Sequence, residues 1–191
     1  MIGAAEAINR TMNAAVGFDL IVRTSQRADG EIGGAMFSQC QSYRYLLWRV
    51  WQPDLPLWSF GMLNPSTADH EVMDRTLERC FFRASAGGAG GLIVWNLFAW
   101  RSTDPADMKR AEDPVGPAND TATLMAVRDC AKNIAGWGAH GDWRGRDVQV
   151  RKLLAMTNVP LCALDFTNAG QPKHPLYLSA RLPALPWRYA A

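Results

Sequence analysis

The segment GGAGGLIVWN, residues 87–96, decides the fold class. Its four apolar residues, Leu92 to Trp95, follow one another without alternation, which is typical of a strand covered on both faces. The glycines before them end a helix in this interpretation, and Asn96 closes the strand. Strands of this kind belong to parallel sheets with helices on both sides, so the segment predicts an α/β protein.

The chain on both sides of this segment extends the same pattern. Aromatic and β-branched residues over 43–51, and apolar runs over 57–63, 134–137 and 160–164, predict further strands. Helices are expected after the N-caps Asp74 and Asp104, and over about 117–133 and 147–157. Because strands alternate with helices, we expect a three-layer α/β sandwich with a mainly parallel central sheet and an antiparallel first strand at its edge.

Composition sets the domain organisation. The length of 191 residues fits a single core. Residues 1–34 are rich in small residues and scattered charges, which predicts a loosely attached N-terminal arm with a short helix at about 4–15. Residues 35–191 are then expected to form a single α/β domain.

Several function classes are excluded by composition. Apolar residues make up 48% of the chain and charged residues 20%, unlike a disordered tail. No apolar run approaches the ~18 residues that a membrane-spanning helix needs, so no membrane partner is expected. The net charge of +2 excludes a histone-like protein but leaves room for a local basic patch. The start of the chain does not resemble a secretory signal, so the expected compartment is the cytoplasm.

Metal and cofactor sites are not expected. The four cysteines are separated by at least 32 residues, which excludes a CxxC-type clip, and the three histidines are equally dispersed. Buried free thiols are the expectation for these cysteines. The residues concerned are Cys40, Cys80, Cys130 and Cys162, with His70, His140 and His174.

Polar residues follow the apolar runs. In open parallel sheets, ligands bind beyond the carboxyl ends of the strands, so these positions are the candidate site. The candidates are Asn64, Pro65, Ser66 and Asp69 after the second strand, Asn96 and Arg101 after the third, Gly138 after the fourth, and Lys173 and His174 after the fifth.

Each candidate also has a simpler explanation. Asn64 before a proline starts turns, Asn96 can bond a neighbouring backbone group, and a histidine such as His174 often caps a loop. The basic run 143–152, with Arg144 and Arg146, suits phosphates, but a solvated helix face is the alternative. The tryptophans lie in or beside predicted strands and are expected in the core. The glycines at 87–91 lack a following Lys-Ser or Lys-Thr and do not form a phosphate loop.

Four motifs resemble one bacterial and phage family, catalogued as domain of unknown function 1643. The resemblance covers about residues 36–185. It is carried by MLNPSTAD at 62–69, NLFA at 96–99, Trp137-Gly138, and HPLYL at 174–178.

The order of these motifs is also similar to that of the uracil-DNA glycosylase superfamily. The resemblance implies that Asn64 positions the attacking water, Asn96 reads the base edge, and His174 stabilises the departing base anion. Asp69 completes the candidate catalytic set without a counterpart in the superfamily. Met62 stands where the superfamily often has glycine, and HPLY replaces its serine-containing late motif.

These observations lead to one hypothesis and two alternatives. The first is an N-glycosidase of the uracil-DNA glycosylase-like type that acts on a natural or modified base in DNA. The alternatives are a nucleoside or nucleotide hydrolase of the same fold, and a non-catalytic nucleotide or nucleic-acid binder. Pro65, Ser66, Arg101 and Gly138 would then contact the substrate, and Arg144, Arg146 and Lys173 the nucleic acid. The expected partner is a nucleic acid or nucleotide, and no cofactor or metal is expected.

Overall fold

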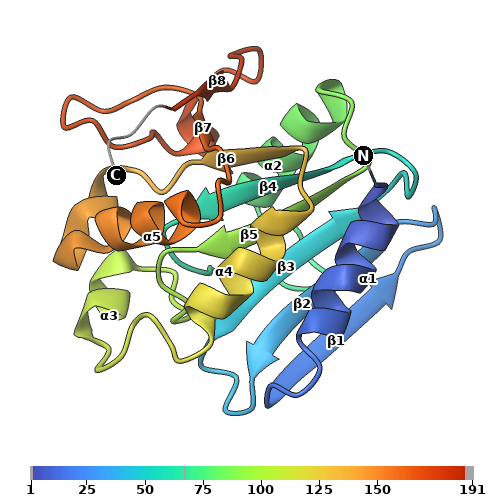
Figure 1. Ribbon diagram of the computed structural model, residues 1–191, viewed down its shortest axis with the longest axis horizontal. Helices are drawn as coiled ribbons and strands as arrows, with labels where there is room; N and C mark the ends of the chain where they lie inside the picture. The colour runs from blue at the N-terminus through green and yellow to red at the C-terminus, as the bar shows by residue number, and fades with distance from the viewer. Residues whose placement is uncertain (1, 67, 188–191) are drawn as a thin grey trace.

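A mixed β-sheet flanked by helices carries the fold (Figure 1). The computed structural model describes residues 2–66 and 68–187, so Thr67 of the MLNPSTAD motif lies outside the described residues. The strands are β1 (Leu20–Gln26), β2 (Ile32–Ser38), β3 (Arg44–Val50), β4 (Leu57–Met62), β5 (Gly91–Asn96), β6 (Lys132–Ala135), β7 (Cys162–Ala163) and β8 (Leu185–Pro186). The α-helices are α1 (Ala4–Ala14), α2 (Arg75–Ala86), α3 (Pro105–Arg110), α4 (Asn119–Arg128) and α5 (Arg146–Ala155), with 3₁₀ turns η1 (Ala139–Gly145) and η2 (Pro175–Tyr177).

The sheet has the strand order β1-β2-β3-β5-β4-β6-β7-β8 within the described chain. The α/β class is confirmed, but the expectation of a mainly parallel sheet is wrong. Only β5, β4, β6 and β7 run parallel, while β1, β2, β3 and β8 pair antiparallel. The short connections β1–β2 and β2–β3 permit only antiparallel pairing, and they place β3 inside the sheet instead of at its edge.

The apolar segment that predicts the fold is the central strand β5. It lies between β3 and β4, and all six of its residues are buried. Leu92 and Val94 belong to the core cluster that α2 covers. Ile93 and Trp95 belong to the opposite cluster, which includes residues of α1, α4 and α5. The prediction of a strand covered on both faces is therefore confirmed.

Helix boundaries follow the capping residues. The Asp74 carboxylate accepts a hydrogen bond from the Leu77 amide at 2.8 Å, and Gly87 caps the end of α2 after Ala86, as predicted. α3 likewise starts with a hydrogen bond from the Ala106 amide to Asp104. α4 ends at Arg128, earlier than expected, because Ile134 and its neighbours form β6 beside β4. No helix in the described part of the chain is long and apolar enough to cross a membrane.

The first 34 residues contribute to the core and the sheet. Ala4, Ala7 and Ile8 of α1 are buried in the main cluster, and β1 and β2 extend the sheet beside β3. The expected boundary at residue 34 falls within β2. A Cβ atom on Gly34 would lie 2.1 Å from the Trp48 ring, so this glycine reflects close packing instead of a flexible arm. We still predict that the rest of the chain folds without these residues. Removal of residues 1–34 tests this prediction.

The central strand gives a stability test. Ile93 is 0% exposed, so Ile93→Ala leaves a cavity and should lower the free energy of unfolding by about 2–5 kcal/mol. Val22 in β1 is 41% exposed, and Val22→Ala should change this free energy by less than about 0.5 kcal/mol. Urea denaturation measures both values. Equal losses for the two variants would contradict the central position of β5.

Candidate functional site

A cavity of about 470 Å³ lies at the carboxyl ends of the parallel strands. The residues after β4, β5 and β6 line it, together with the first turn of α2 and with η2. β5 and β6 flank β4 on opposite sides, so the strand order reverses at β4. Such a switch point is where open α/β sheets bind ligands. The polar residues of the lining are Arg44, Asn64, Ser66, Asp74, Thr76, Asn96, Ser102, Thr103, His140 and His174.

The structure brings five of the predicted site residues to this cavity. They are Asn64, Ser66, Asn96, Gly138 and His174. Six others lie outside its lining, namely Pro65, Asp69, Arg101, Arg144, Arg146 and Lys173.

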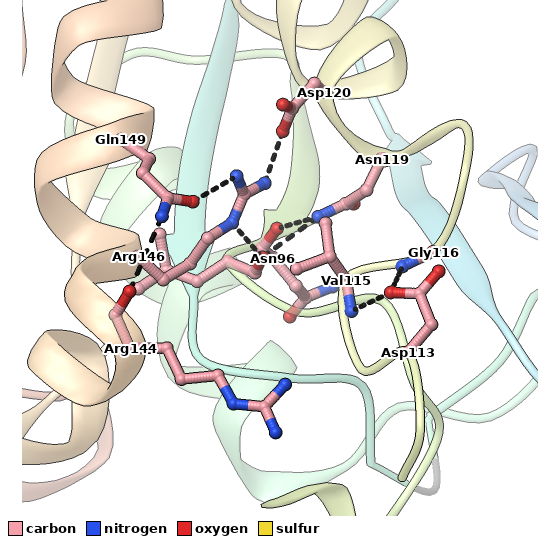
Figure 2. Close-up of polar contacts among 10 residues, drawn as sticks. Asn96, Asp113, Val115, Gly116, Asn119, Asp120, Arg144, Arg146 and Gln149 are labelled. Carbon is pink, nitrogen blue, oxygen red and sulfur yellow. Dashed lines mark hydrogen bonds and ion pairs between the residues drawn. The ribbon is translucent and has the colours of Figure 1, made fainter.

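Asn96 has an unpaired side chain in the cavity wall. The residue is only 1% exposed, yet within the described chain neither its Nδ2 nor its Oδ1 has a hydrogen-bond partner. Its backbone, in contrast, is firmly held: the Asn119 Nδ2 donates to the carbonyl oxygens of Asn96 (2.9 Å) and Leu97 (3.0 Å) (Figure 2). Leaving a buried polar group unpaired costs about 1–3 kcal/mol of folding free energy. A ligand that offers both a donor and an acceptor would remove this cost by pairing with the amide.

Arg146 serves the same strand end and is not a surface cation. Its Nε donates to the Leu97 carbonyl at 2.9 Å, and its other nitrogens contact Asp120 and Gln149 (Figure 2). The side chain is buried, so it does not offer the phosphate contact expected from the sequence. A long-range contact to Asp120 decides its position, and the spacing of charges along the chain does not reveal such a contact.

Asn64 is held by a contact beyond its own turn. Its Nδ2 donates to the carbonyl oxygens of Pro65 (3.1 Å) and of Ser102, which is distant in sequence (2.7 Å). Both amide donors are used, so the orientation of the side chain is fixed. Its Oδ1 has no partner among the described residues and can accept a hydrogen bond from a water or a ligand.

His174 is arranged as a neutral hydrogen-bond donor. Its Nδ1 accepts a hydrogen bond from the Leu176 amide at 3.3 Å, which places the proton of the neutral ring on Nε2. Burial lowers the pKa of His174 below its usual 6.5, against the opposing charge of Asp74. Gly138, with φ 75°, turns the chain opposite this histidine, where a Cβ atom would lie 3.8 Å from the His174 Cβ.

Asp69 serves a turn outside the cavity. Its Oδ1 accepts hydrogen bonds from the amides of Glu71 and Val72, both at 2.8 Å. The carboxylate that lines the cavity belongs to Asp74, the N-cap of α2. The sequence identifies Asp74 only as a capping residue, and the capping pattern does not reveal that it also faces a cavity.

Arg44, at the start of β3, is a second residue that the sequence analysis missed. It lines the cavity although it is only 4% exposed, and its guanidinium donates to the Ala68 carbonyl. Burial lowers its pKa to about 10, while Asp74 opposes the shift. The signal that could have identified Arg44 is its charge, because it stands in the otherwise apolar run 43–51 that predicts a buried strand.

The other predicted cations have protein contacts outside the cavity. Arg101 donates to the Gln41 carbonyl at 3.0 Å and lies 5.2 Å from the Phe37 ring centroid. Arg144 stacks at 4.4 Å on Trp143, and Lys173 pairs with Asp165 at 2.6 Å. Of these three, Arg101 and Arg144 are exposed.

Metal ligation has no candidate within residues 2–66 and 68–187. No group of three or more His, Cys, Asp or Glu side chains that could hold an ion occurs there. The four cysteines are free; the expectation of burial holds for Cys80, while Cys130 and Cys162 are partly buried and Cys40 is exposed. Cys80 is buried and lines the cavity, where burial raises the pKa of its thiol.

Comparisons with known proteins relate the chain to one family. A search of curated proteins gave no match, and a search of solved structures gave none. One family matches residues 44–176, which is more than half of the chain and includes Arg44, Asn64, Asn96 and His174. The chain therefore belongs to the family described as protein of unknown function (DUF1643).

Proposed function

We propose that the protein binds a nucleobase in this cavity and hydrolyses the N-glycosidic bond between the base and its sugar. The observation that carries the proposal is the Asn96 amide, buried at the switch point with both its donor and its acceptor unpaired. An asparagine amide pairs in bidentate fashion with a base edge that offers an adjacent acceptor and donor. Such a base satisfies both orphaned atoms at once.

A uracil-DNA glycosylase-like, three-layer fold is part of this proposal. Its support is that Asn64, Asn96 and His174, each from a different motif, line one cavity. The two core clusters on opposite faces of the sheet, one including residues of α2 and the other residues of α1, α4 and α5, are compatible with three layers.

The chemistry assigns one step to each side chain. As the bond from base nitrogen to sugar carbon breaks, its electron pair moves to the base, and the sugar carbon becomes positive. The His174 Nε2–H donates a hydrogen bond to the base oxygen that gains this charge. The Asn64 Oδ1 orients a water whose oxygen adds to the sugar carbon. The proton that this water loses balances the charge of the departing base, which leaves a free base and a sugar hydroxyl.

The substrate class has two candidates. A natural or modified base in DNA is the first, and Arg144 is an exposed cation for that role. A free nucleoside or nucleotide is the second, and it is favoured by the burial of Arg146 and the ion pair of Lys173. The salt dependence of binding distinguishes the two classes. For DNA, log Kd rises by about 0.9 per phosphate contact for each log unit of salt concentration, whereas a nucleoside would show no such dependence.

Base release is the direct test of the proposal. The protein is incubated with natural DNA, phage-modified DNA, nucleosides and nucleotides, and mass spectrometry identifies the free bases. Release of one kind of base is the expected result. Binding without any release would leave the non-catalytic nucleotide or nucleic-acid binder as the function.

His174 should act on the transition state. Its hydrogen bond strengthens only as charge reaches the base, so His174→Ala should lower kcat by about 10²–10³ with little change in KM. Steady-state kinetics on the identified substrate measures both constants. His70 lies outside the lining of the cavity, and His70→Ala serves as the control with unchanged kcat. Full turnover by the His174→Ala variant would remove His174 from the reaction.

Alanine variants of Asn96 and Asn119 should affect different properties, the first base affinity and the second the free energy of unfolding. Asn96→Ala removes no internal hydrogen bond of the side chain, so its free energy of unfolding should not fall, while base affinity should fall about tenfold to hundredfold. Asn119→Ala removes two buried hydrogen bonds and should lower the free energy of unfolding by about 1–3 kcal/mol. Thermal unfolding and base titration measure the two effects. An Asn96→Ala variant with unchanged base affinity would contradict the base-reading role.

A further inference from the structure

Four arginines of the described residues are buried, and three of them have at least three protein contacts. Arg49 contacts Glu31 and two backbone carbonyls, and Arg83 donates to three carbonyls. Arg146 contacts Asp120, Gln149 and the Leu97 carbonyl. Each guanidinium therefore has at least three partners, as a buried cation requires.

Arg44 is the exception. The described residues give it one hydrogen bond, to the Ala68 carbonyl, which is fewer than any of the other three has, and its buried Nε, like that of Arg83, has no partner. Like Arg83, it has no ion pair with a described carboxylate, but it lacks the three carbonyl contacts that Arg83 makes. It is also the arginine among the four that lines the cavity. A buried guanidinium with unused donors at a cavity wall is a site for an anionic oxygen group.

We infer that Arg44 binds the phosphate of a free nucleotide whose base contacts Asn96. The inference rests on the proposed function and names its substrate class. The hydroxyl-bearing residues Ser66, Thr76, Ser102 and Thr103 line the same cavity and supply further hydrogen-bond donors for phosphate or sugar oxygens.

The burial of Arg44 selects a terminal phosphate. A phosphate inside a DNA strand is joined to the chain on both sides, so its strand would have to pass through the cavity. A phosphate monoester ends the ligand and can reach a side chain that is 4% exposed. The cavity of about 470 Å³ is within the range of small-ligand sites.

Asp74 allows a variant that should strengthen phosphate binding, whereas variants of Arg44 should weaken it. Its carboxylate lines the same cavity, and its charge acts on Arg44. It should therefore weaken the binding of a phosphate through repulsion. Asn caps helices as well as Asp does, so Asp74→Asn keeps the hydrogen bond from the Leu77 amide and removes the charge.

The experiment is a calorimetric titration of the full chain with nucleosides, their 5′-monophosphates and inorganic phosphate. For at least one base, the monophosphate should bind about tenfold to hundredfold more tightly than its nucleoside. Arg44→Met should abolish this preference, and Arg44→Lys should keep part of it. Asp74→Asn should increase the preference. Asp54→Asn alters an exposed carboxylate that neither lines the cavity nor acts on Arg44, and it should leave the preference unchanged.

Other outcomes overturn the inference. Equal affinities of nucleoside and monophosphate would do so, as would an unchanged preference in the folded Arg44→Lys and Asp74→Asn variants. Tight binding of a single-stranded oligonucleotide without binding of any monophosphate would assign the site to a nucleic-acid strand. Monophosphate binding that depends on Arg44, without base release, would support the phosphate site and contradict the proposed hydrolysis, so the two failures are distinguishable.

Discussion

Three hydrogen bonds to the end of β5 hold the candidate site in place. The carbonyl oxygens of Asn96 and Leu97 accept them from Asn119 of α4 and Arg146 of α5 (Figure 2). Two helices thereby fix one strand end through its backbone. Because these bonds satisfy the backbone and not the side chain, the Asn96 amide remains unpaired in the cavity wall.

The antiparallel part of the sheet contributes to the same site. β3 runs opposite to β5, so its first residue, Arg44, lies beside the carboxyl ends of the parallel strands. Arg44 and Arg49 donate to the backbone of Ala68 and Asp69, and Ser25 donates to the His70 carbonyl. The long segment between β4 and α2 is therefore held by β1 and β3, and it supplies Asn64, Ser66 and Asp74 to the cavity. A wholly parallel sheet would lack this support.

The sequence is sufficient for the features that depend on local pattern. β3, β4, β5 and the start of α2 follow from apolar runs and a capping aspartate. Asn64, Asn96 and His174 are found because each follows an apolar run, and strand ends meet at one edge. Their roles in chemistry are still proposals.

The features that the sequence does not reveal depend on distant contacts. The sequence predicts that the strand over 43–51 is antiparallel but places it at the edge of the sheet, and only its pairing with β5 brings Arg44 to the cavity. Asp69 and Asp74 both accept backbone hydrogen bonds, so only the path of the segment distinguishes the acid in the cavity from the acid in the turn. Gly34 of β2 packs against the Trp48 ring and Gly33 against the His70 carbonyl, although composition alone favours a loosely attached arm.

The side-chain amide of Asn96 is the most direct point at which to test the account. Its ¹⁵N–¹H resonances are assigned from the missing signals of Asn96→Ala and followed while natural and modified bases are added. The account predicts a large shift with one kind of base, and no shift for Asn133, whose buried Oδ1 already accepts from Ser59 at 2.6 Å. Resonances of Asn96 that stay unchanged with every base, while a substrate is bound or hydrolysed, would contradict the assignment of this cavity to a nucleobase.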